Sequence, residues 1–224
     1  SEWITYDNNR YYFDGDGVMY TGMKEVDGTR YYFHSWGGVY HNESFTWQGK
    51  KYWAKDDGTF YTGVCDINGK KYYFLEDGEQ ITKEGWYLTN GTYYWINANG
   101  TRRDDELFQY DGNYYYVDKN GVMATSGWVY WDYNYYYPRS WGGMYKNAFI
   151  TYDNNLYYLG SDSKMAIGWQ SIGGNTYYFR SWGGMITGKQ VIDGKTYVFD
   201  EDGKLVQSPD GFEPSAQIGV RTVR

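Results

Sequence analysis

The feature that most constrains the fold is a repeat of 20 to 22 residues that runs through most of the chain. Each unit carries a pair or triplet of aromatic residues. Aligning the units on these aromatics gives ten starts: Tyr11, Tyr31, Tyr52, Tyr72, Tyr93, Tyr114, Tyr135, Tyr157, Tyr177 and Tyr197. A fixed period of this length is typical of arrays in which each unit packs only against its neighbours. We therefore predict a repeat array over residues 1–207 and interpret residues 208–224 as a tail or linker.

Two turns are predicted in each unit. The first is a dipeptide such as Asp27-Gly28 or Asn68-Gly69, or an Asn pair such as Asn8-Asn9, and these residues accept the positive φ of a two-residue hairpin turn. The second turn follows the aromatics, as at Asp57-Gly58. An isolated two-stranded hairpin is marginal in water, so the units must stack and bury their aromatic faces. The predicted fold is an all-β solenoid of about ten stacked hairpins.

The composition excludes several classes of protein. The chain of 224 residues holds 30 Tyr and 11 Trp but only six Ala and six Leu, which is too few helix formers for a helical bundle. A net charge of −7 argues against nucleic acid or an anionic membrane as the partner. One cysteine and two histidines cannot assemble the usual zinc spacings, and no apolar run is long enough for membrane insertion. We expect neither a metal nor a cofactor.

A Trp-Gly-Gly sequence occurs in three units. Trp36, Trp141 and Trp182 replace the Asp or Asn usual in the second turn, and each unit gains a second glycine. Because a bulky residue is poorly suited to positive φ, we interpret the extra glycine as relief of the backbone. Arg139 and Arg180 stand near two of these rings and can donate paired hydrogen bonds to sugar hydroxyls. The alternative is that the Trp rings fold over the next hairpin and fill the core.

A Gly-Trp pair at the start of the unit supplies three more candidates, Trp86, Trp128 and Trp169. Each ring is available either to a ligand or to packing between hairpins, and the sequence leaves both interpretations open. We predict that all three rings contact the ligand.

Units such as "GWQSIGGNTYYFRSWGGMITGK" (168–189) and "GVCDINGKKYYFLEDGEQITKEGW" (63–86) resemble the cell-wall-binding or choline-binding repeat superfamily. This superfamily includes the glucan-binding repeats of bacterial glucosyltransferases and the receptor-binding repeats of large clostridial toxins. The resemblance covers about nine tenths of the chain. It implies a solenoid of hairpins on a secreted or surface-attached protein of Gram-positive bacteria, used to hold carbohydrate or choline-bearing wall polymers.

The aromatic residues bear on the choice of ligand. A quaternary ammonium is held by several aromatic faces, with Trp the best of them. The choline-binding members resemble one another in a Trp that opens the second-strand cluster, whereas here Tyr opens most of them and Trp appears only as Trp53 and Trp95. This departure favours a polysaccharide partner, an α-glucan or a cell-wall glycan, whose sugar rings stack on aromatic faces. The alternatives are a choline or teichoic-acid anchor, a toxin-like host-glycan module, and a structural spacer or protein-interaction surface.

No catalytic constellation is present in the sequence. The acidic residues fall mostly in predicted turns, and no pair is marked out as the acid and nucleophile of a glycosidase. Neither His34 nor His41 has a recognisable nucleophile partner. We predict a noncatalytic binding module, excised from a longer secreted protein that holds any catalytic domain elsewhere.

Overall fold

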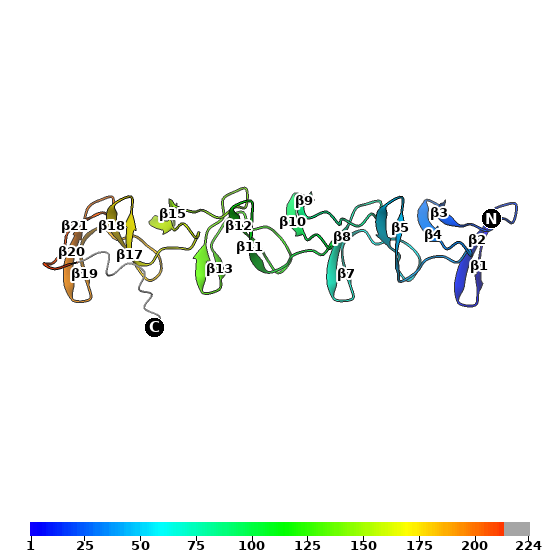
Figure 1. Cartoon of the computed structure of the whole chain (residues 1–224), viewed down its shortest axis with the longest axis horizontal. Coiled ribbons are helices and arrows are strands. Elements are labelled where there is room, and N and C mark those ends of the chain that lie inside the picture. The colour runs from blue at the N-terminus through cyan, green and yellow to red at the C-terminus, as the bar shows by residue number, and fades with distance from the viewer. Residues whose placement is uncertain (213–224) are drawn as a thin grey trace. The chain divides into compact units, whose positions relative to one another are not determined.

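The computed structural model describes residues 1–212, in which ten antiparallel hairpins follow one another and no helix occurs (Figure 1). The first ten strands are β1 (Glu2–Tyr6), β2 (Asn9–Phe13), β3 (Gly22–Val26), β4 (Thr29–Phe33), β5 (Ser44–Trp47), β6 (Lys50–Trp53), β7 (Gly63–Ile67), β8 (Lys70–Phe74), β9 (Gly85–Thr89) and β10 (Thr92–Ile96). The strands that follow are β11 (Glu106–Tyr110), β12 (Asn113–Val117), β13 (Val129–Trp131), β14 (Asn134–Tyr136), β15 (Ala148–Tyr152), β16 (Asn155–Leu159), β17 (Gly168–Ile172), β18 (Asn175–Phe179), β19 (Gly188–Ile192), β20 (Lys195–Phe199) and β21 (Leu205–Gln207). The predicted all-β repeat fold is confirmed.

The hairpins fall into two compact units. The first comprises Ser1–Asp105 with Val117–Val122, and the second comprises Glu106–Tyr116 with the described residues from Met123 onward. Each unit has its own buried aromatic clusters, and each is described below by itself.

The first turn of each repeat has the predicted chemistry. Asp27 and Gly28 adopt φ values of 51° and 76°, the double positive φ of a two-residue hairpin turn. Two predicted Asn-pair turns, Asn8-Asn9 and Asn154-Asn155, were each misplaced by one residue. Tyr6 pairs with Asn9, so the first hairpin turns at Asp7 and Asn8 rather than at Asn8 and Asn9. Asn tolerates left-handed φ, and the side chain of Asn9 closes the turn by donating to the Asp7 carbonyl at 2.8 Å.

Backbone hydrogen bonds join consecutive repeats. In several repeats the residue that follows the second turn donates its N–H to a backbone carbonyl in the second strand of the preceding hairpin. The bonds from Val39 to Arg10 and from Met165 to Tyr135 are both 2.8 Å long. This hydrogen bond recurs in successive repeats and sets the register in which they stack. The sequence predicted stacking but not this register.

The core runs along the stacked hairpins inside each unit. Alternate residues of the second strand point inward, so that Tyr177 and Phe179 of β18 are buried while Tyr178 between them is half-buried. The last residue of this strand is fully buried in repeat after repeat, as at Phe33, Phe74 and Phe179. These inward rings supply most of the apolar area that stabilises a repeat array.

The array closes at its C-terminal end with β21, which adds a third strand beside β20. Phe212 then packs onto the last hairpins, with its ring 4.7 Å from that of Trp169 and 5.2 Å from that of Tyr197. Of the segment predicted as a tail, residues 213–224 lie outside the described part of the chain.

Candidate functional site

The turn tryptophans lie on the surface, and their backbone is not what the sequence predicted. Trp36, Trp141 and Trp182 are 49%, 48% and 50% exposed, which contradicts the alternative that they fill the core. The positive φ falls on the first glycine after each Trp, as at Gly183 with 92°, and not on the Trp itself. The second glycine has a steric role, since a Cβ on Gly184 would lie 2.0 Å from the Trp182 ring. Because glycine has no Cβ, the Trp182 ring can lie flat across the turn.

Each Trp-Gly-Gly turn packs against a Tyr and a Met of the preceding repeat. The Trp182 ring lies 6.0 Å from Tyr157, edge to face, and Trp36 and Trp141 contact Tyr11 and Tyr115 in the same geometry. A methionine lies beneath the turn, because a Cβ on Gly183 would fall 2.3 Å from the Met165 sulfur. Met19 and Met123 occupy the corresponding positions under Gly37 and Gly142.

At Trp182 these contacts form one side of an aromatic hollow of about 340 Å³, called here the Trp182 hollow. Its lining residues come from three successive repeats: Trp128, Tyr135, Tyr157, Met165, Ser181 and Trp182. Trp128 lies 5.0 Å from Tyr157 and 6.3 Å from Tyr135, with interplanar angles of 63° and 88°. Burial, followed by the nearby Asp153 carboxylate, raises the pKa of Tyr157, so its phenol is neutral at physiological pH. The hollow therefore presents aromatic faces, one thioether and the Ser181 hydroxyl, with no charged side chain among its lining residues.

The predicted site residues thus separate into groups. Trp128 and Trp182 come together in the hollow, while Trp141 lies beside Arg139, whose guanidinium carbon is 5.8 Å from its ring. Arg180 is exposed. Trp86 is half-buried and contacts Trp95 edge to face at 5.2 Å.

Trp169 differs from the ligand-contact prediction. It is only 6% exposed, because Tyr197 and Phe212 cover its ring at 4.9 Å and 4.7 Å. Sequence analysis did not predict that Phe212, a residue after the last repeat, packs there. We therefore leave Trp169 out of the proposed site.

Tyr135, Tyr157 and Met165 are lining residues that the sequence-based selection missed. A signal was present: Tyr135 and Tyr157 open the aromatic groups of consecutive repeats, and a Met stands eight residues after Tyr157, just as Met19 stands eight after Tyr11. Because the hollow draws on three repeats, candidates chosen one repeat at a time could not reveal it.

The Trp128–Tyr157 pair has counterparts at both ends of the array. In the first unit Trp3 lies 5.0 Å from Tyr31, and in the second Trp169 lies 4.9 Å from Tyr197, again edge to face. The third neighbour differs. At Trp3 it is the Arg10 guanidinium, 4.2 Å above the ring, and at Trp169 it is Phe212. We call Trp3, Tyr31 and Arg10 the N-terminal cage. We call Trp169, Tyr197 and Phe212 the C-terminal cage.

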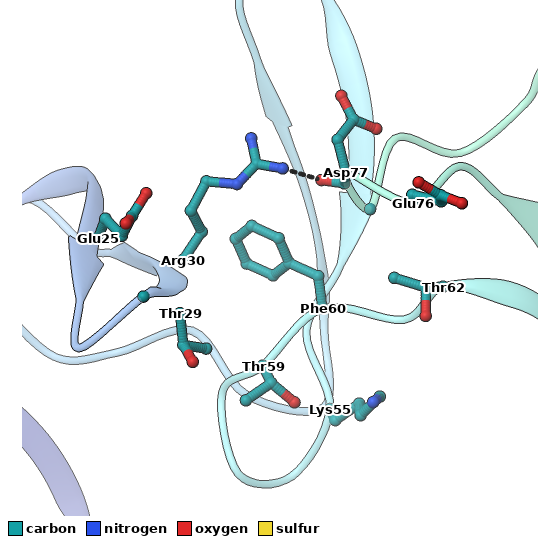
Figure 2. Close-up of a pocket in the computed structure, with 11 residues that line it drawn as sticks. Glu25, Thr29, Arg30, Lys55, Thr59, Phe60, Thr62, Glu76 and Asp77 are labelled. Carbon is teal, nitrogen blue, oxygen red and sulfur yellow. Dashed lines mark hydrogen bonds between the residues drawn. The ribbon is translucent and has the colours of Figure 1, made fainter.

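A hollow of a different character lies in the first unit and has a volume of about 300 Å³ (Figure 2). Its lining is mostly polar, with Glu25, Arg30, Lys55, Glu76 and Asp77 contributing charges of both signs. The Arg30 side chain extends across it and donates Nη2–H to the Asp77 carbonyl at 2.8 Å. This hydrogen bond links repeats 47 residues apart and gives the hollow a structural function.

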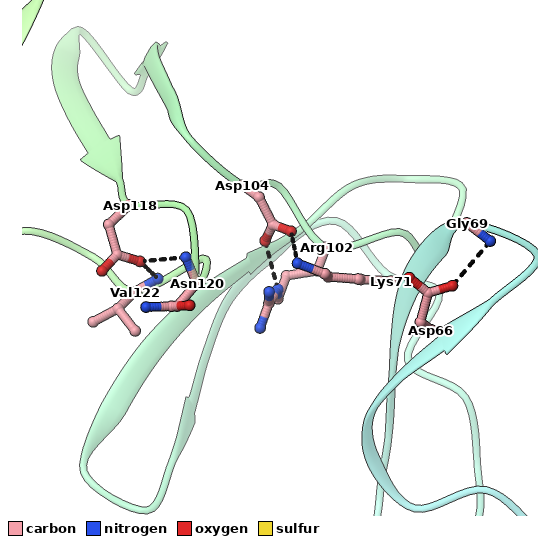
Figure 3. A network of polar contacts seen from close by, with 8 residues as sticks. All are labelled: Asp66, Gly69, Lys71, Arg102, Asp104, Asp118, Asn120 and Val122. Carbon is pink, nitrogen blue, oxygen red and sulfur yellow. Dashed lines mark hydrogen bonds and ion pairs between the residues drawn. The ribbon is translucent and has the colours of Figure 1, made fainter.

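Figure 3 shows a second polar network in the same unit. Asp104 pairs with the Nε of Arg102 at 2.6 Å and with Lys71 at 3.0 Å, and Arg102 is largely buried. Asp118 accepts backbone N–H groups from Asn120 and Val122, which closes a turn. Each carboxylate shown already has partners, so we interpret the network as structural.

Metal and membrane chemistry find no support within residues 1–212. No group of three His, Cys, Asp or Glu side chains there could hold a metal ion. Likewise, that part of the chain has no helix long and apolar enough to cross a membrane. Burial raises the pKa of the Cys65 thiol, which lowers its reactivity at neutral pH.

Comparison with known families gives two matches. Residues 166–208 match a model described as a choline-binding repeat. Residues 1–19, 66–79, 105–123 and 147–162 match one described as a cell wall binding repeat. No curated protein matches the chain.

Three solved structures from Streptococcus pneumoniae are similar to this chain. CbpJ is 22% identical, with a TM-score of 0.69 over 94% of this chain and 90% of its own. The choline-binding domain of CbpL is 28% identical, with a TM-score of 0.64 over 82% of this chain and 96% of its own. The modular autolysin LytC, solved with a synthetic peptidoglycan ligand, is 24% identical, with a TM-score of 0.65 over 93% of this chain. The match spans 48% of LytC.

Proposed function

Because the chain carries repeats of the choline-binding and cell-wall-binding superfamily, we propose that it is a noncatalytic module that attaches a surface protein to the wall of a Gram-positive bacterium. Two of the similar proteins point the same way, since one is a choline-binding domain and another was solved with a peptidoglycan ligand. The match spans about half of LytC, and we propose that any catalytic activity of a longer parent protein resides outside these repeats.

The Trp182 hollow is the observation that carries the proposal. Its aromatic faces surround a space of about 340 Å³, within the range of small-ligand pockets, roughly 300–1,000 Å³. A quaternary ammonium has no N–H to donate, so aromatic faces are its main short-range partners, each contributing about 0.5–2 kcal/mol. The net charge of −7 adds a general attraction for a cation. We assign the hollow to the choline headgroup of a wall polymer, which revises our sequence-based preference for a sugar.

A wall glycan is a second candidate ligand, favoured by the surface at Trp141. Its ring is half exposed and has the Arg139 guanidinium beside it, which is the combination of flat face and hydrogen-bond donor that a sugar ring uses. Repeated weak contacts of this kind would gain avidity on a polymer. An α-glucan remains the finer form of this candidate, and it has no support beyond the aromatic character of the repeats.

Retention on matrices tests these assignments. The parent chain is expected to bind a choline resin and elute with free choline. Trp182→Ala should weaken choline binding about tenfold, the loss of one strong cation–π face. Because that ring is half exposed, the thermal midpoint should change little. Tyr133→Asn is the matched control, since it removes a largely exposed ring outside the hollow and Asn accepts the positive φ there.

Contrary results would be informative in different ways. Full choline affinity in a folded Trp182→Ala chain would remove the hollow from the site. A parent chain that ignores choline but binds peptidoglycan, dextran or starch, with loss in Trp141→Ala, would favour the glycan candidate.

A further inference from the structure

The N-terminal cage stands at the same position in its repeats as the Trp182 hollow. Trp3 and Trp128 each precede the residue that pairs with a corresponding Tyr of their own hairpin, Ile4 with Tyr11 and Val129 with Tyr136. The other corresponding residues are Arg10 for Tyr135, Tyr31 for Tyr157 and Asp57 for Trp182. The two sites thus share the Trp and the Tyr, while Arg10 and Asp57 stand where the hollow has Tyr135 and Trp182.

The pair of rings has the same geometry in both places. Trp3 and Tyr31 lie 5.0 Å apart at 71°, and Trp128 and Tyr157 lie 5.0 Å apart at 63°. What differs is the space above the Trp. In the N-terminal cage the Arg10 guanidinium carbon is 4.2 Å from the Trp3 centroid, well inside the range of a cation–π contact. Its Nη1–H is donated to the Asp57 carbonyl at 2.9 Å.

We propose that Arg10 is an intramolecular cation that occupies the N-terminal cage, so that this cage is closed to external cations and becomes a binding site when Arg10 is removed. The inference rests on the proposed function, in which the corresponding hollow takes a quaternary ammonium. A guanidinium tethered within the chain has a high effective concentration and excludes a free cation of similar affinity.

The next repeat provides an internal comparison. Arg30 corresponds to Arg10 and makes the same type of hydrogen bond, to the Asp77 carbonyl at 2.8 Å (Figure 2). Met23 stands there in place of Trp3. Both repeats therefore share the inter-repeat hydrogen bond, while the aromatic seat for the cation is found at Arg10. This separates occupation of a cage from the structural function of the hydrogen bond.

The experiment uses the full chain and counts cation sites by calorimetry and equilibrium dialysis, with choline and methylguanidinium as probes. The background is Trp182→Ala, which weakens the hollow. Adding Arg10→Ala should raise the number of sites by one, with a Kd within about tenfold of that of the Trp182 hollow in the parent. Arg30→Ala is the matched control, because it loses the corresponding hydrogen bond and should gain no site.

Arg10→Gln is studied in parallel because Arg10→Ala could fail to fold. The Gln amide keeps a donor near the Asp57 carbonyl and has no charge, so it too should open the cage. A gained site that disappears on adding Trp3→Ala would place the probe on the predicted ring. If a folded Arg10 variant binds neither probe beyond its Trp182→Ala background, the inference is wrong.

The same measurements keep the two proposals apart. Choline binding by the parent chain, lost on Trp182→Ala, reports on the hollow alone. If the parent ignores choline, the proposed function fails, whereas methylguanidinium still tests whether the N-terminal cage accepts a cation once Arg10 is gone. Binding of methylguanidinium by the Arg10 variants and not by the Arg30 control would then support the inference by itself.

Discussion

The N-terminal cage and the Trp182 hollow have the same Trp–Tyr pair, with centroids 5.0 Å apart in both, yet one holds a side chain of its own and the other is open. The pair is set by features common to the repeats, namely the hairpin register and the backbone hydrogen bond between neighbours. The two sites differ at the position of Arg10 and Tyr135 and at the position of Asp57 and Trp182. The repeat therefore supplies the framework, and in our proposal these variable positions decide whether it binds an external cation.

The strand position that Arg10 occupies changes character along the chain. At this position the first four repeats have Arg10, Arg30, Lys51 and Lys71, and the next three have Tyr93, Tyr114 and Tyr135. The cations of the first unit are used internally, as in the contacts of Arg10 and Arg30 with carbonyls and of Lys71 with Asp104. This trend favours a mainly structural function for the early repeats and ligand binding for the later ones.

The largest effect should come from the shared framework. Phe33 and Phe179 are fully buried at corresponding strand ends, and truncating either to Ala should cost about 3–5 kcal/mol of unfolding free energy. Chemical denaturation measures the unfolding free energy of each variant, with the fluorescence of the two units followed separately. Val191→Ala, at an exposed strand position, is the control with little effect. A cost below about 1 kcal/mol for only one Phe would break the equivalence of the two regions.

The next effect concerns the second glycine of the Trp182 turn. A Cβ on Gly184 would lie 2.0 Å from the Trp182 ring, so Gly184→Ala must displace that ring. We expect choline affinity to fall about tenfold, as for loss of the ring itself. Gly15→Ala, in the second turn of the first repeat, is the control, because a Cβ on Gly15 would have its nearest neighbour at 4.0 Å. Unchanged affinity in Gly184→Ala would show that the position of the ring does not matter.

The fold was predictable from the sequence because its signals are local and repeated. Turn dipeptides such as Asp27-Gly28 and the period of the aromatic groups specify hairpins and their number without reference to distant contacts. The sequence left open whether the turn tryptophans contact a ligand or fill the core, and the structure places them half exposed, while the reason inferred for the second glycine was wrong. Steric fit of a ring over a turn depends on the side-chain rotamer, which a sequence does not record.

The composition of the cages could not be predicted, because it depends on contacts between repeats. Arg10 reaches a carbonyl 47 residues away, and Phe212 covers Trp169 from beyond the last repeat. Candidate residues such as Trp128 and Trp169 look alike in sequence, since both follow a glycine. Trp128 lines the hollow, whereas Trp169 is buried because Phe212 packs on its ring. The difference comes from a side chain distant in sequence.

The C-terminal cage sharpens the comparison with a neutral occupant. Phe212→Ala should uncover Trp169, with a red shift of its emission and a loss of about 1 kcal/mol, since Phe212 contributes two aromatic contacts. It should also create a weak cation site at the Trp169–Tyr197 pair. Trp169→Phe in the same background is the control that removes the shifted emission. An unshifted spectrum in Phe212→Ala would mean that Phe212 does not cover this ring in solution.

The smallest effect is expected from alkaline pH. Burial is the main cause that raises the pKa of Tyr157, and a folded-state pKa above the unfolded value gives stability that is complete below pH 10. This stability is lost as the pH rises through the folded-state value, because the unfolded state then releases the proton more readily. The thermal midpoint should therefore be level with respect to this group up to about pH 10 and fall above it. Tyr157→Phe should make the fall shallower, and absorbance of the phenolate at alkaline pH follows the titration itself. An equally steep fall in the variant would show that Tyr157 ionises no later in the folded chain than in the unfolded one, and the hollow would then be more open to water than its packing indicates.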